Sequence, residues 1–382
     1  MSSRLGPRVV PVIVVATAFA LIAAGGCRDV YVRPLRWGPG GAGGDAGGAA
    51  SGGRAPVGGA SGVAGDPDTG GVSGSGGASG TGGAVDCPPS TLIGFAAVDG
   101  GTTGGEGGPV MVARTMETLK DLADTTGPMV IRIDGMIQTS GLIDISSDKT
   151  VEGVGKASGL VGGGLRVKES RNIIIRNLII TKAVAPADAI QLLTATNVWI
   201  DHCDLSSDLA NGKTYYDGLV DISHAADDIT VSWTRFHDHF HASLIGHSND
   251  NGPEDTGHLN VTFHHNLFDN TQYELPRVRF GHAHVFNNHY RNVGTYAIAS
   301  QMGAAVLVER NLFENVTRTL LTHFEDPTDG TMHESENKWI ASGASEITAD
   351  TAWRPTYPYT GDWDSMNSVA LVVDACAGVA GP

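Results

Sequence analysis

A nine-residue pattern that recurs six times between Asn172 and Phe313 constrains the fold of this chain more than any other feature. The pattern reads NIIIRNLII from 172, NVWIDHCDL from 197, DITVSWTRF from 228, NVTFHHNLF from 260, HAHVFNNHY from 282 and AVLVERNLF from 305. Positions two and four are apolar in every copy, and position nine is Ile, Leu, Phe or Tyr. This alternation is typical of a strand that buries one of its faces.

The spacing of the copies indicates a solenoid. Successive copies start 25, 31, 32, 22 and 23 residues apart, and the segments between them are rich in β-branched residues, Gly, Asn and Asp. A β-sandwich, the alternative, would show short strands about every 8 to 12 residues without such similarity between units. We therefore predict an all-β chain that folds as a right-handed parallel β-helix, in which each coil buries its inward side chains against the next.

Two of the spacings are longer than the others. The additional residues fall in the segments 206–218 and 246–258. Insertions into a solenoid become loops on one face, which is often the face that binds the ligand. Near the start of the predicted solenoid, the segment 116–127 is the one plausible helix, and we expect it to cover the edge of the first coil.

The first residues of the chain are similar to an export signal. Arg4 and Arg8 precede an apolar run over residues 9–24 that ends in small residues, as in secretory signals. A membrane-spanning helix needs about 20 apolar residues, and the run over residues 9–24 is shorter. We therefore favour a cleaved signal over residues 1–27 and keep a retained anchor as the alternative. Cys27 follows two glycines and resembles the acceptor cysteine of bacterial lipoproteins. We expect a secreted, extracellular protein, with a lipid anchor at Cys27 that could tether it to the cell surface.

The segment that follows has the composition of a tether. From residue 38 to residue 83, 21 of 46 residues are glycine, and large apolar side chains are nearly absent. Such a stretch cannot bury enough surface to fold. We therefore predict a Gly/Ala/Ser-rich disordered linker over residues 28–88 and a β-helix domain over residues 89–382.

Three further cysteines lie at the edges of this domain or within it. Cys87 and Cys376 bracket the domain, and in an exported protein they could form a disulfide. Cys203 lies between alternating apolar residues, so we predict a buried thiol.

The overall charge limits the partners. The formal net charge is −16, which argues against a nucleic acid or an anionic membrane as the partner. An anionic ligand would require local cations or a bound metal. We expect the protein to act as a monomer.

Three aspartates are predicted to meet at one outward-facing position. Asp217 and Asp221 are four residues apart in YDGLVD, so on a strand they point to the same side. Counted from the repeat of its own coil, Asp188 falls between them, one coil away, and adjacent strands are about 4.8 Å apart. Three carboxylates repel one another unless a cation joins them, and oxygen ligands favour Ca²⁺. The alternative is a set of solvated surface aspartates.

Histidines offer a rival metal site. His237, His239 and His241 alternate along one segment and therefore share a face, and three such histidines could bind Zn²⁺. No acidic or thiol partner occurs at a matching register, so we favour stacked polar side chains on a half-buried face.

Several of these segments together resemble the calcium-dependent pectate lyases of the β-helix class. They are WIDHCDL, YYDGLVDI, ITVSWTRFHDH, SLIGHSND and LPRVRFG, and GFAAVDGGTTGGEGG over 94–108 is similar to the opening strand and loop of that family. The resemblance implies cleavage of polygalacturonate, or another acidic polysaccharide, by β-elimination. It also implies that the three aspartates bind Ca²⁺ and that Arg279 holds the substrate, with Arg277 beside it.

The chemistry of β-elimination explains these residue types. The proton on C5 of a uronate lies beside a carboxylate, so a base can remove it only when that anion is neutralised. Calcium and cationic side chains provide the neutralisation.

The sequence departs from the family motif at two positions. Glu274 in YELPRVRFG replaces the arginine that serves as the base, and His241 replaces a lysine. Glu274 could itself be the base, although a carboxylate is about eight pKa units less basic than a neutral arginine. A nearby arginine, Arg277 or Arg235, could take over.

Two further interpretations of Glu274 stay open. The chain could bind pectate without cleaving it, or Glu274 and one aspartate could act as the acid and base of a glycoside hydrolase. We favour an active lyase in which Glu274, Arg277 and Arg279 are catalytic, while His241 and Arg279 bind the substrate.

Overall fold

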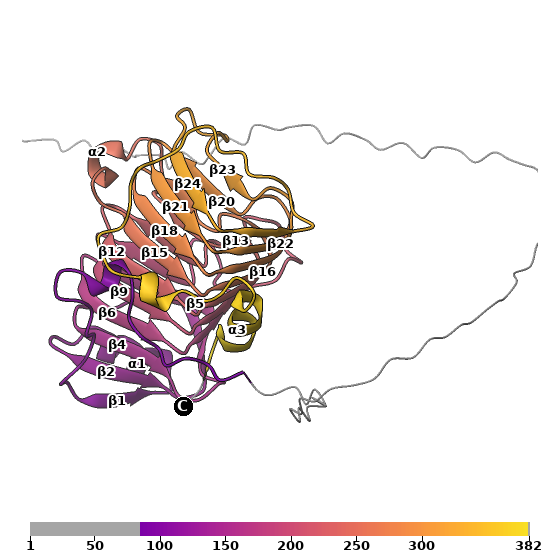
Figure 1. Cartoon of the computed structure of the whole chain (residues 1–382). Coiled ribbons are helices and arrows are strands. Elements are labelled where there is room, and N and C mark those ends of the chain that lie inside the picture. The colour runs from indigo at the N-terminus through magenta and orange to yellow at the C-terminus, as the bar shows by residue number, and fades with distance from the viewer. Residues whose placement is uncertain (1–84, 381–382) are drawn as a thin grey trace, which may run out of the picture. The chain divides into compact units, whose positions relative to one another are not determined.

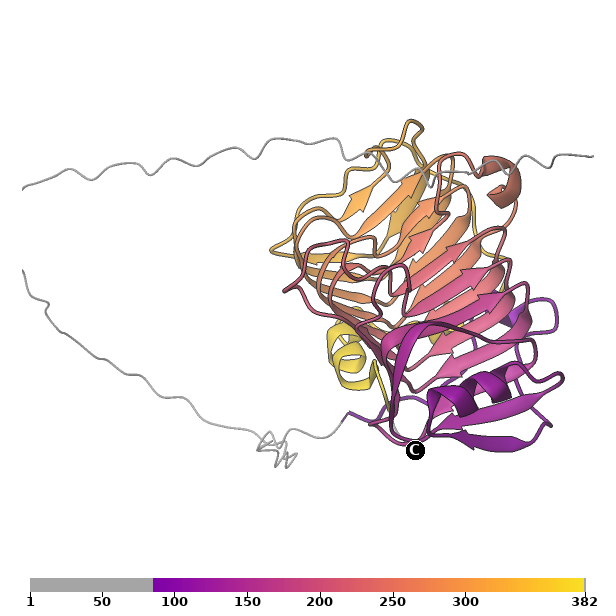
Figure 2. The same ribbon diagram turned by 180° about the vertical axis from the view of Figure 1, so that it is seen from behind.

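The computed structural model describes residues 85–380, whose strands stack as the coils of a parallel β-helix (Figures 1 and 2). The prediction of the fold class is confirmed. The predicted export signal, Cys27 and nearly all of the predicted linker lie outside the described residues, so those interpretations stay predictions. No helix in the described part of the chain has the length and apolar character needed to cross a membrane.

The first sheet, called sheet A here, contains ten strands and the first part of each repeat. In order across the sheet they are β1 (Val110–Ala113), β2 (Met129–Ile133), β4 (Lys149–Gly153), β6 (Arg171–Arg176), β9 (Thr196–Asp201), β12 (Asp227–Ser232), β15 (Asn260–His264), β18 (His282–Phe286), β21 (Ala305–Glu309) and β24 (Thr331–Ser335). Pairing places Ile173 opposite Val198, and Val198 opposite Ile229. Equivalent positions of successive repeats therefore stack directly on one another.

The second sheet contains fifteen strands and forms the other two sides of the coil. The long strand β5 (Gly159–Lys168) pairs with β7 through its first half and with β8 through its second half, and β3 (Met136–Asp144) pairs alongside it. The β7 face consists of β7 (Ile179–Thr181), β10 (Asp204–Ser206), β13 (Arg235–His241), β16 (Leu267–Tyr273), β19 (His289–Val293), β22 (Leu312–Val316) and β25 (Lys338–Ile340). The β8 face consists of β8 (Ile190–Leu193), β11 (Val220–Ser223), β14 (Leu244–Ile245), β17 (Arg277–Arg279), β20 (Ile298–Gln301) and β23 (Leu320–Leu321).

Short helices lie outside the coils. They are the 3-10 helices η1 (Phe95–Ala97) and η2 (Thr360–Asp362) and the α-helices α1 (Met116–Ala123), α2 (Gly252–Asp255) and α3 (Val369–Cys376). Helix α1 confirms the helix predicted within 116–127, and it begins where Thr115 accepts a hydrogen bond from the backbone of Thr118. The prediction of an opening strand within 94–108 is wrong, because Phe95–Ala97 form the 3-10 helix η1. The backbone N–H groups of Phe95 and Ala96 donate to the hydroxyl groups of Thr262 and Thr230 on sheet A, and not to a neighbouring strand.

The two predicted insertions border the same sheet face. Residues 207–219 lead from β10 into β11, and residues 246–259, which include α2, lead from β14 to β15. One loop therefore enters the β8 face and the other leaves it. The β8 face lies between the two longest inter-strand loops of the repeat region, as expected for a surface that binds a ligand.

Position six of each repeat turns the chain from sheet A to the β7 face. All six residues there have a positive φ: Asn177 at 53°, His202 at 48°, Trp233 at 47°, His265 at 55°, Asn287 at 51° and Arg310 at 52°. The left-handed conformation is uncommon outside glycine. The repeated turn therefore depends on the stacking of neighbouring coils, which holds these residues in place.

Buried asparagines join the coils immediately after this turn. Asn266, Asn288, Asn311 and Asn337 follow one another across the coils. The backbone N–H of each of the first three donates to Oδ1 of the next, at 2.8, 2.9 and 2.9 Å. This ladder satisfies amide groups that would otherwise be buried without a partner.

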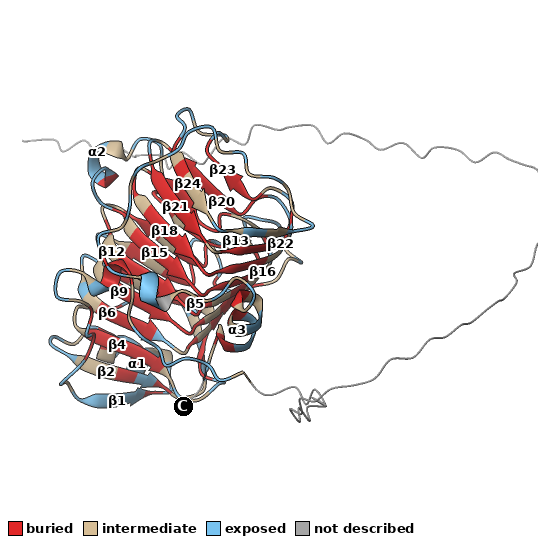
Figure 3. Ribbon diagram, viewed as in Figure 1, coloured by how far each residue is buried: buried red, intermediate tan, exposed pale blue. Residues whose placement is uncertain are grey.

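Position nine supplies a column of stacked rings inside the solenoid. Phe236, Phe268, Tyr290, Phe313 and Trp339 follow one another with ring centroids 4.6, 4.8, 4.8 and 5.9 Å apart. Together with the apolar residues at positions two and four they form one continuous core, seen as buried segments along both sheets (Figure 3). The predicted inward face of the repeat is confirmed.

The cysteines behave as predicted. Cys87 and Cys376 form a disulfide across a sequence separation of 289 residues. It links the segment that precedes the first coil to α3, which packs through Val369 and Val373 against Leu267 and Leu312. Cys203 is a buried free thiol.

Replacing Asn288 by leucine is expected to destabilise the β-helix by about 3 kcal/mol or more, because each buried polar group left without a partner costs about 1 to 3 kcal/mol. The change would leave the carbonyl groups of Phe263 and Phe286 and the N–H of Asn266 without this partner. Denaturant unfolding followed by circular dichroism measures the effect. Asn367→Ala, at an exposed position, serves as the control, and equal midpoints for the two variants would contradict a structural role for the ladder.

Candidate functional site

The structure brings the three predicted aspartates to the β8 face. Asp221 lies opposite Gln191 in the pairing of β11 with β8, so Asp188 falls beside Gly218. The N–H of Gly218 donates to Oδ1 of Asp188 at 2.7 Å, and Nε2 of Gln191 donates to Oδ2 at 2.8 Å. Asp188 therefore lies one coil away from Asp217 and Asp221 and between them along the strand direction.

The glycine that follows Asp217 is required by this packing. A Cβ atom at Gly218 would collide with the carboxylate of Asp221. Oδ1 of Asp221 also accepts a hydrogen bond of 3.1 Å from the backbone of Leu244, one coil further on. A glycine is thus needed at position 218, because the carboxylate of Asp221 lies close to the backbone there.

The aspartates destabilise one another's ionised forms. Burial, followed by the negative charge of Asp217, raises the pKa of Asp188 to about 7. Burial and the charges of Asp188 and Glu274 also raise the pKa of Asp221. Burial is the larger cause of both shifts, and the charges of the neighbouring carboxylates add to it.

A hard cation would suit this set of donors. All are carboxylate oxygens, the ligands that Ca²⁺ prefers, and their mutual repulsion would be relieved by a divalent ion. Within residues 85–380, no three acidic, histidine or cysteine side chains are already gathered tightly enough to form a metal site. The chemistry of the residues therefore fits Ca²⁺, while a finished coordination cage is absent from the described region.

Glu274 lies at the edge of the same group of carboxylates. The residue connects β16 to β17, is only 6% exposed, and adopts a left-handed φ of 65°. Its Oε2 lies 3.3 Å from Nδ1 of His241, and its Oε1 lies 3.5 Å from Nη1 of Arg277. The negative charge of Glu274 is among the causes of the raised pKa of Asp221, so the two carboxylates repel each other.

His241 is positioned as the partner of Glu274. Its Nε2 lies 3.0 Å from the carbonyl oxygen of Lys213 and 3.0 Å from the hydroxyl of Tyr273. A carboxylate only accepts hydrogen bonds, so Nδ1 of His241 is the donor in the contact with Glu274.

The three alternating histidines of β13 do not share a metal centre. His239 contacts Oγ of Ser207 at 2.5 Å and the carbonyl oxygen of Asp217 at 2.6 Å, and burial lowers its pKa to about 4. His237 contacts Asp204 and Asp238. Each ring has its own partners, which supports the interpretation of polar side chains that fix neighbouring segments. His239 in particular holds the backbone beside Asp217 in place.

Arg277 and Arg279 lie on β17 and share the outward side of the β8 face with Asp221. The strand pairing places Leu244 beside Asp221 on the next coil, and Arg277 beside Leu244 on the coil after that. Arg277 is therefore two coils, or about 10 Å, from Asp221. Both arginines are at least nine-tenths buried. The resemblance to the family implies that Arg279 binds the uronate of the substrate, with Arg277 beside it.

A carboxylate that the sequence did not reveal holds both arginines. Oδ1 of Asp326 accepts from Nη2 of Arg277 at 2.9 Å, and Oδ2 accepts from Nε of Arg279 at 2.8 Å. Asn249, from the loop 246–259, also hydrogen-bonds to Asp326. The remaining donors of Arg277 reach Gln301 at 2.6 Å and Glu325 at 3.4 Å.

Arg235 cannot replace the missing arginine. It lies at the first position of β13, six residues before His241, and six residues of strand span about 20 Å. Its nearest acidic partner is Asp204, at 3.9 Å. Of the two arginines considered as substitutes, only Arg277 is near Glu274.

Comparison with known proteins places these observations in a family. Residues 84–381 match the family described as pectate lyase. Pectate lyase plyB of Emericella nidulans is 43% identical over 230 residues, which cover 60% of this chain and 69% of that protein. Pectate lyase A of Aspergillus niger is 40% identical over 290 residues, which cover 75% of this chain and 86% of that protein.

A solved structure agrees with the sequence relatives. The crystal structure of a pectate lyase from Bacillus sp. N165 in complex with trigalacturonate superimposes with a TM-score of 0.70 at 29% identity, over 76% of this chain and 99% of that one. The fold, the aspartates of the β8 face and these similarities agree. The chain belongs to the pectate lyase family.

Proposed function

We propose that this protein cleaves polygalacturonate by calcium-dependent β-elimination on its β8 face. The observation that carries the proposal is the placement of Asp188, Asp217 and Asp221 on the same outward surface as Arg277 and Arg279. Membership of a family of lyases supports this activity over a binding-only protein or a glycoside hydrolase. The trigalacturonate bound by the Bacillus relative supports an acidic galacturonan as the substrate.

The three aspartates would hold the cation. A bound Ca²⁺ would neutralise the carboxylate of the uronate beside the scissile bond and so acidify the proton on C5. Asp188 is fixed by Gly218 and Gln191, and Asp221 by Leu244, so their carboxylates are oriented before any cation arrives. His239 would support the site by holding the carbonyl of Asp217.

Glu274 would remove the proton. The C5–H bond breaks, its electron pair forms the double bond between C4 and C5, and the C4–O4 bond breaks, with the leaving oxygen protonated by solvent. Arg279 and Arg277 would bind and orient the uronate carboxylate. His241, held by Glu274 and Lys213, would contact the substrate in place of the family lysine.

The cellular setting is part of the same proposal. An enzyme that acts on a wall polysaccharide works outside the cell, and the disulfide between Cys87 and Cys376 suits an oxidising compartment. We propose a secreted monomer whose linker over residues 28–88 would connect the β-helix to a lipid on Cys27. Mass spectrometry of the mature N-terminus decides between a free chain and a lipidated one.

Incubation with polygalacturonate and Ca²⁺ is expected to produce the ultraviolet absorbance of an unsaturated uronide. The signal should rise with enzyme concentration, disappear with a chelator, and fall at least about 100-fold in Asp221→Ala, because the cation would lose one of its carboxylates. Circular dichroism controls for folding of the variant. New reducing ends without the chromophore would reveal hydrolysis and contradict the proposal.

Glu274→Gln is expected to lower kcat by roughly 100-fold or more with little change in KM, since general-base catalysis contributes about 10² to 10⁴. Glu325→Gln is the matched control, because Glu325 also contacts Arg277 but its side chain is 61% exposed. A gain of activity in Glu274→Arg would instead show that the native carboxylate hinders the reaction.

Asp326→Asn is expected to lower KM for polygalacturonate by roughly threefold to tenfold, because the two arginines would no longer share an internal carboxylate and would offer more charge to the substrate. Steady-state kinetics at fixed calcium measures the change. Asp329→Asn, at a half-exposed carboxylate that pairs with His323, is the control. A higher KM with a lower kcat would show that Asp326 mainly orients the arginines.

A further inference from the structure

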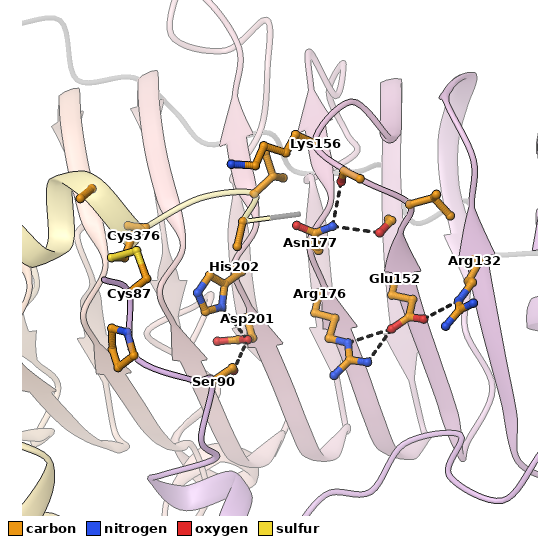
Figure 4. Close-up of a pocket in the computed structure, with 18 residues that line it drawn as sticks. Cys87, Ser90, Arg132, Glu152, Lys156, Arg176, Asn177, Asp201, His202 and Cys376 are labelled. Carbon is orange, nitrogen blue, oxygen red and sulfur yellow. Dashed lines mark hydrogen bonds and ion pairs between the residues drawn. A yellow bond between two sulfur atoms is a disulfide. The ribbon is translucent and has the colours of Figure 1, made fainter. Parts of the chain in front are cut away.

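A cavity of about 770 Å³ lies on the outer side of sheet A, away from the three aspartates of the β8 face (Figure 4). Its floor is formed by β2, β4, β6 and β9 of sheet A, which are separate from the β8 face, where Asp188 and Asp221 lie. Its wall is formed by residues 87–90 and 375–380, which the disulfide between Cys87 and Cys376 holds together. The volume is within the range of about 300 to 1,000 Å³ that is common for small-ligand sites.

Charged side chains alternate in one row along the floor. Strand pairing places Arg132, Glu152, Arg176 and Asp201 side by side on successive coils. Glu152 accepts from Nε of Arg132 at 2.8 Å and from Nε and Nη2 of Arg176 at 2.9 and 2.6 Å. Hydrogen bonds from both guanidinium groups lower the pKa of Glu152 against the opposing effect of its burial. The hydrogen bonds of Glu152 therefore hold both arginines of the row in place.

The carboxylates of the row already accept hydrogen bonds from other groups of the protein. Asp201 is 2% exposed and accepts from Ser90 at 2.5 Å and from Ser232 at 2.6 Å, and it also contacts Nδ1 of His202 at 2.8 Å. Glu152, 8% exposed, is shared by the two arginines. Neither carboxylate presents a free acceptor to a ligand in the cavity.

The positive charges, by contrast, remain accessible. The side chains of Arg132 and Arg176 are 50% and 44% exposed, and their contacts with Glu152 leave both Nη atoms of Arg132 and Nη1 of Arg176 available. Lys156, on the loop after β4, is exposed at the rim and has no ion pair or hydrogen bond from its Nζ within the described residues. Three cationic side chains thus line one cavity of a chain whose net charge is −16.

The facing wall is apolar. It presents Pro88, the disulfide, Ala375, Ala377 and Val379. A ligand that suits both sides has an anionic group for the floor and C–H surface for the wall. A sugar acid has this combination, because its ring carbons form an apolar face and its carboxylate accepts two parallel hydrogen bonds from a guanidinium group.

We propose that this cavity is a second binding site for short oligouronides, separate from the aspartate site. The choice of a uronide among sugar acids rests on the proposed function, since fragments of the polymer are what the enzyme would encounter and release. Arg132, Arg176 and Lys156 would bind uronate carboxylates while the wall contacts the sugar rings. Occupation of the cavity would keep a cleaved chain, or the end of a long one, attached to the enzyme.

Isothermal titration calorimetry of the full chain with trigalacturonate, in a chelator, tests the site without catalysis or calcium. We expect binding in the wild type, and affinity at least roughly tenfold weaker in Lys156→Glu, since a charge-assisted contact contributes about 1.5 to 3 kcal/mol. Glu152→Gln removes a negative charge from the floor and is expected to strengthen binding severalfold. Lys338→Glu, at another exposed lysine, on β25, is the matched control and should bind like the wild type.

The outcomes separate this site from the aspartate site. Unchanged affinity in Arg279→Gln, which removes a uronate-binding group proposed for the β8 face, supports a distinct location, whereas loss of binding in that variant overturns it. Wild-type affinity in Lys156→Glu, no binding by the wild type, or equal affinity for inorganic phosphate would each overturn the assignment of an oligouronide site. The wild-type lyase assay with calcium reports on the proposed function independently, so failure of one conclusion is distinguishable from failure of the other.

Discussion

Parallel pairing of equivalent strands in register is the constraint on which the rest of this molecule depends. Residues 22 to 35 positions apart become direct neighbours, as when the backbone of Asn266 binds Asn288 or the amide of Asn266 binds the carbonyl of Val231. The same rule arranges apolar residues into a core, asparagines into a ladder and rings into a column. It also gathers Asp188, Asp221 and Arg277 on one outward face, although they belong to different coils.

The β8 face is unusual for a surface meant to hold a polyanion. Glu274, Glu325 and Asp326 surround Arg277, so the arginines are balanced by the protein's own carboxylates. Substrate binding would then depend strongly on added cations, because few protein charges remain free to attract it. Glu274 also contacts Nδ1 of His241, at 3.3 Å, so this carboxylate too is engaged by a group of the protein.

Much of the fold follows from the sequence because a strand's pattern is local and repeats. Positions two, four and nine predicted the core, and counting from the repeat predicted that Asp188 lies between Asp217 and Asp221 along the strand direction. Asp326 and Asn249 were not predictable, because they lie in loops that have no register with the coils. The 3-10 helix at Phe95–Ala97 was also missed, since its position depends on hydroxyl groups of distant strands rather than on its own sequence. The cavity beside Cys376 forms only when the segments 87–90 and 375–380, far apart in the sequence, both pack against sheet A.

The disulfide between Cys87 and Cys376 has a consequence for resistance to proteolysis. Because the bond closes a ring of nearly the whole β-helix, a protease that cut the exposed loop 246–259 would produce a nicked protein and not two fragments. The pieces would stay joined covalently at Cys376 and side by side through the strand pairing of neighbouring coils. A β-helix closed in this way can tolerate cleavage of a surface loop without losing half of its solenoid.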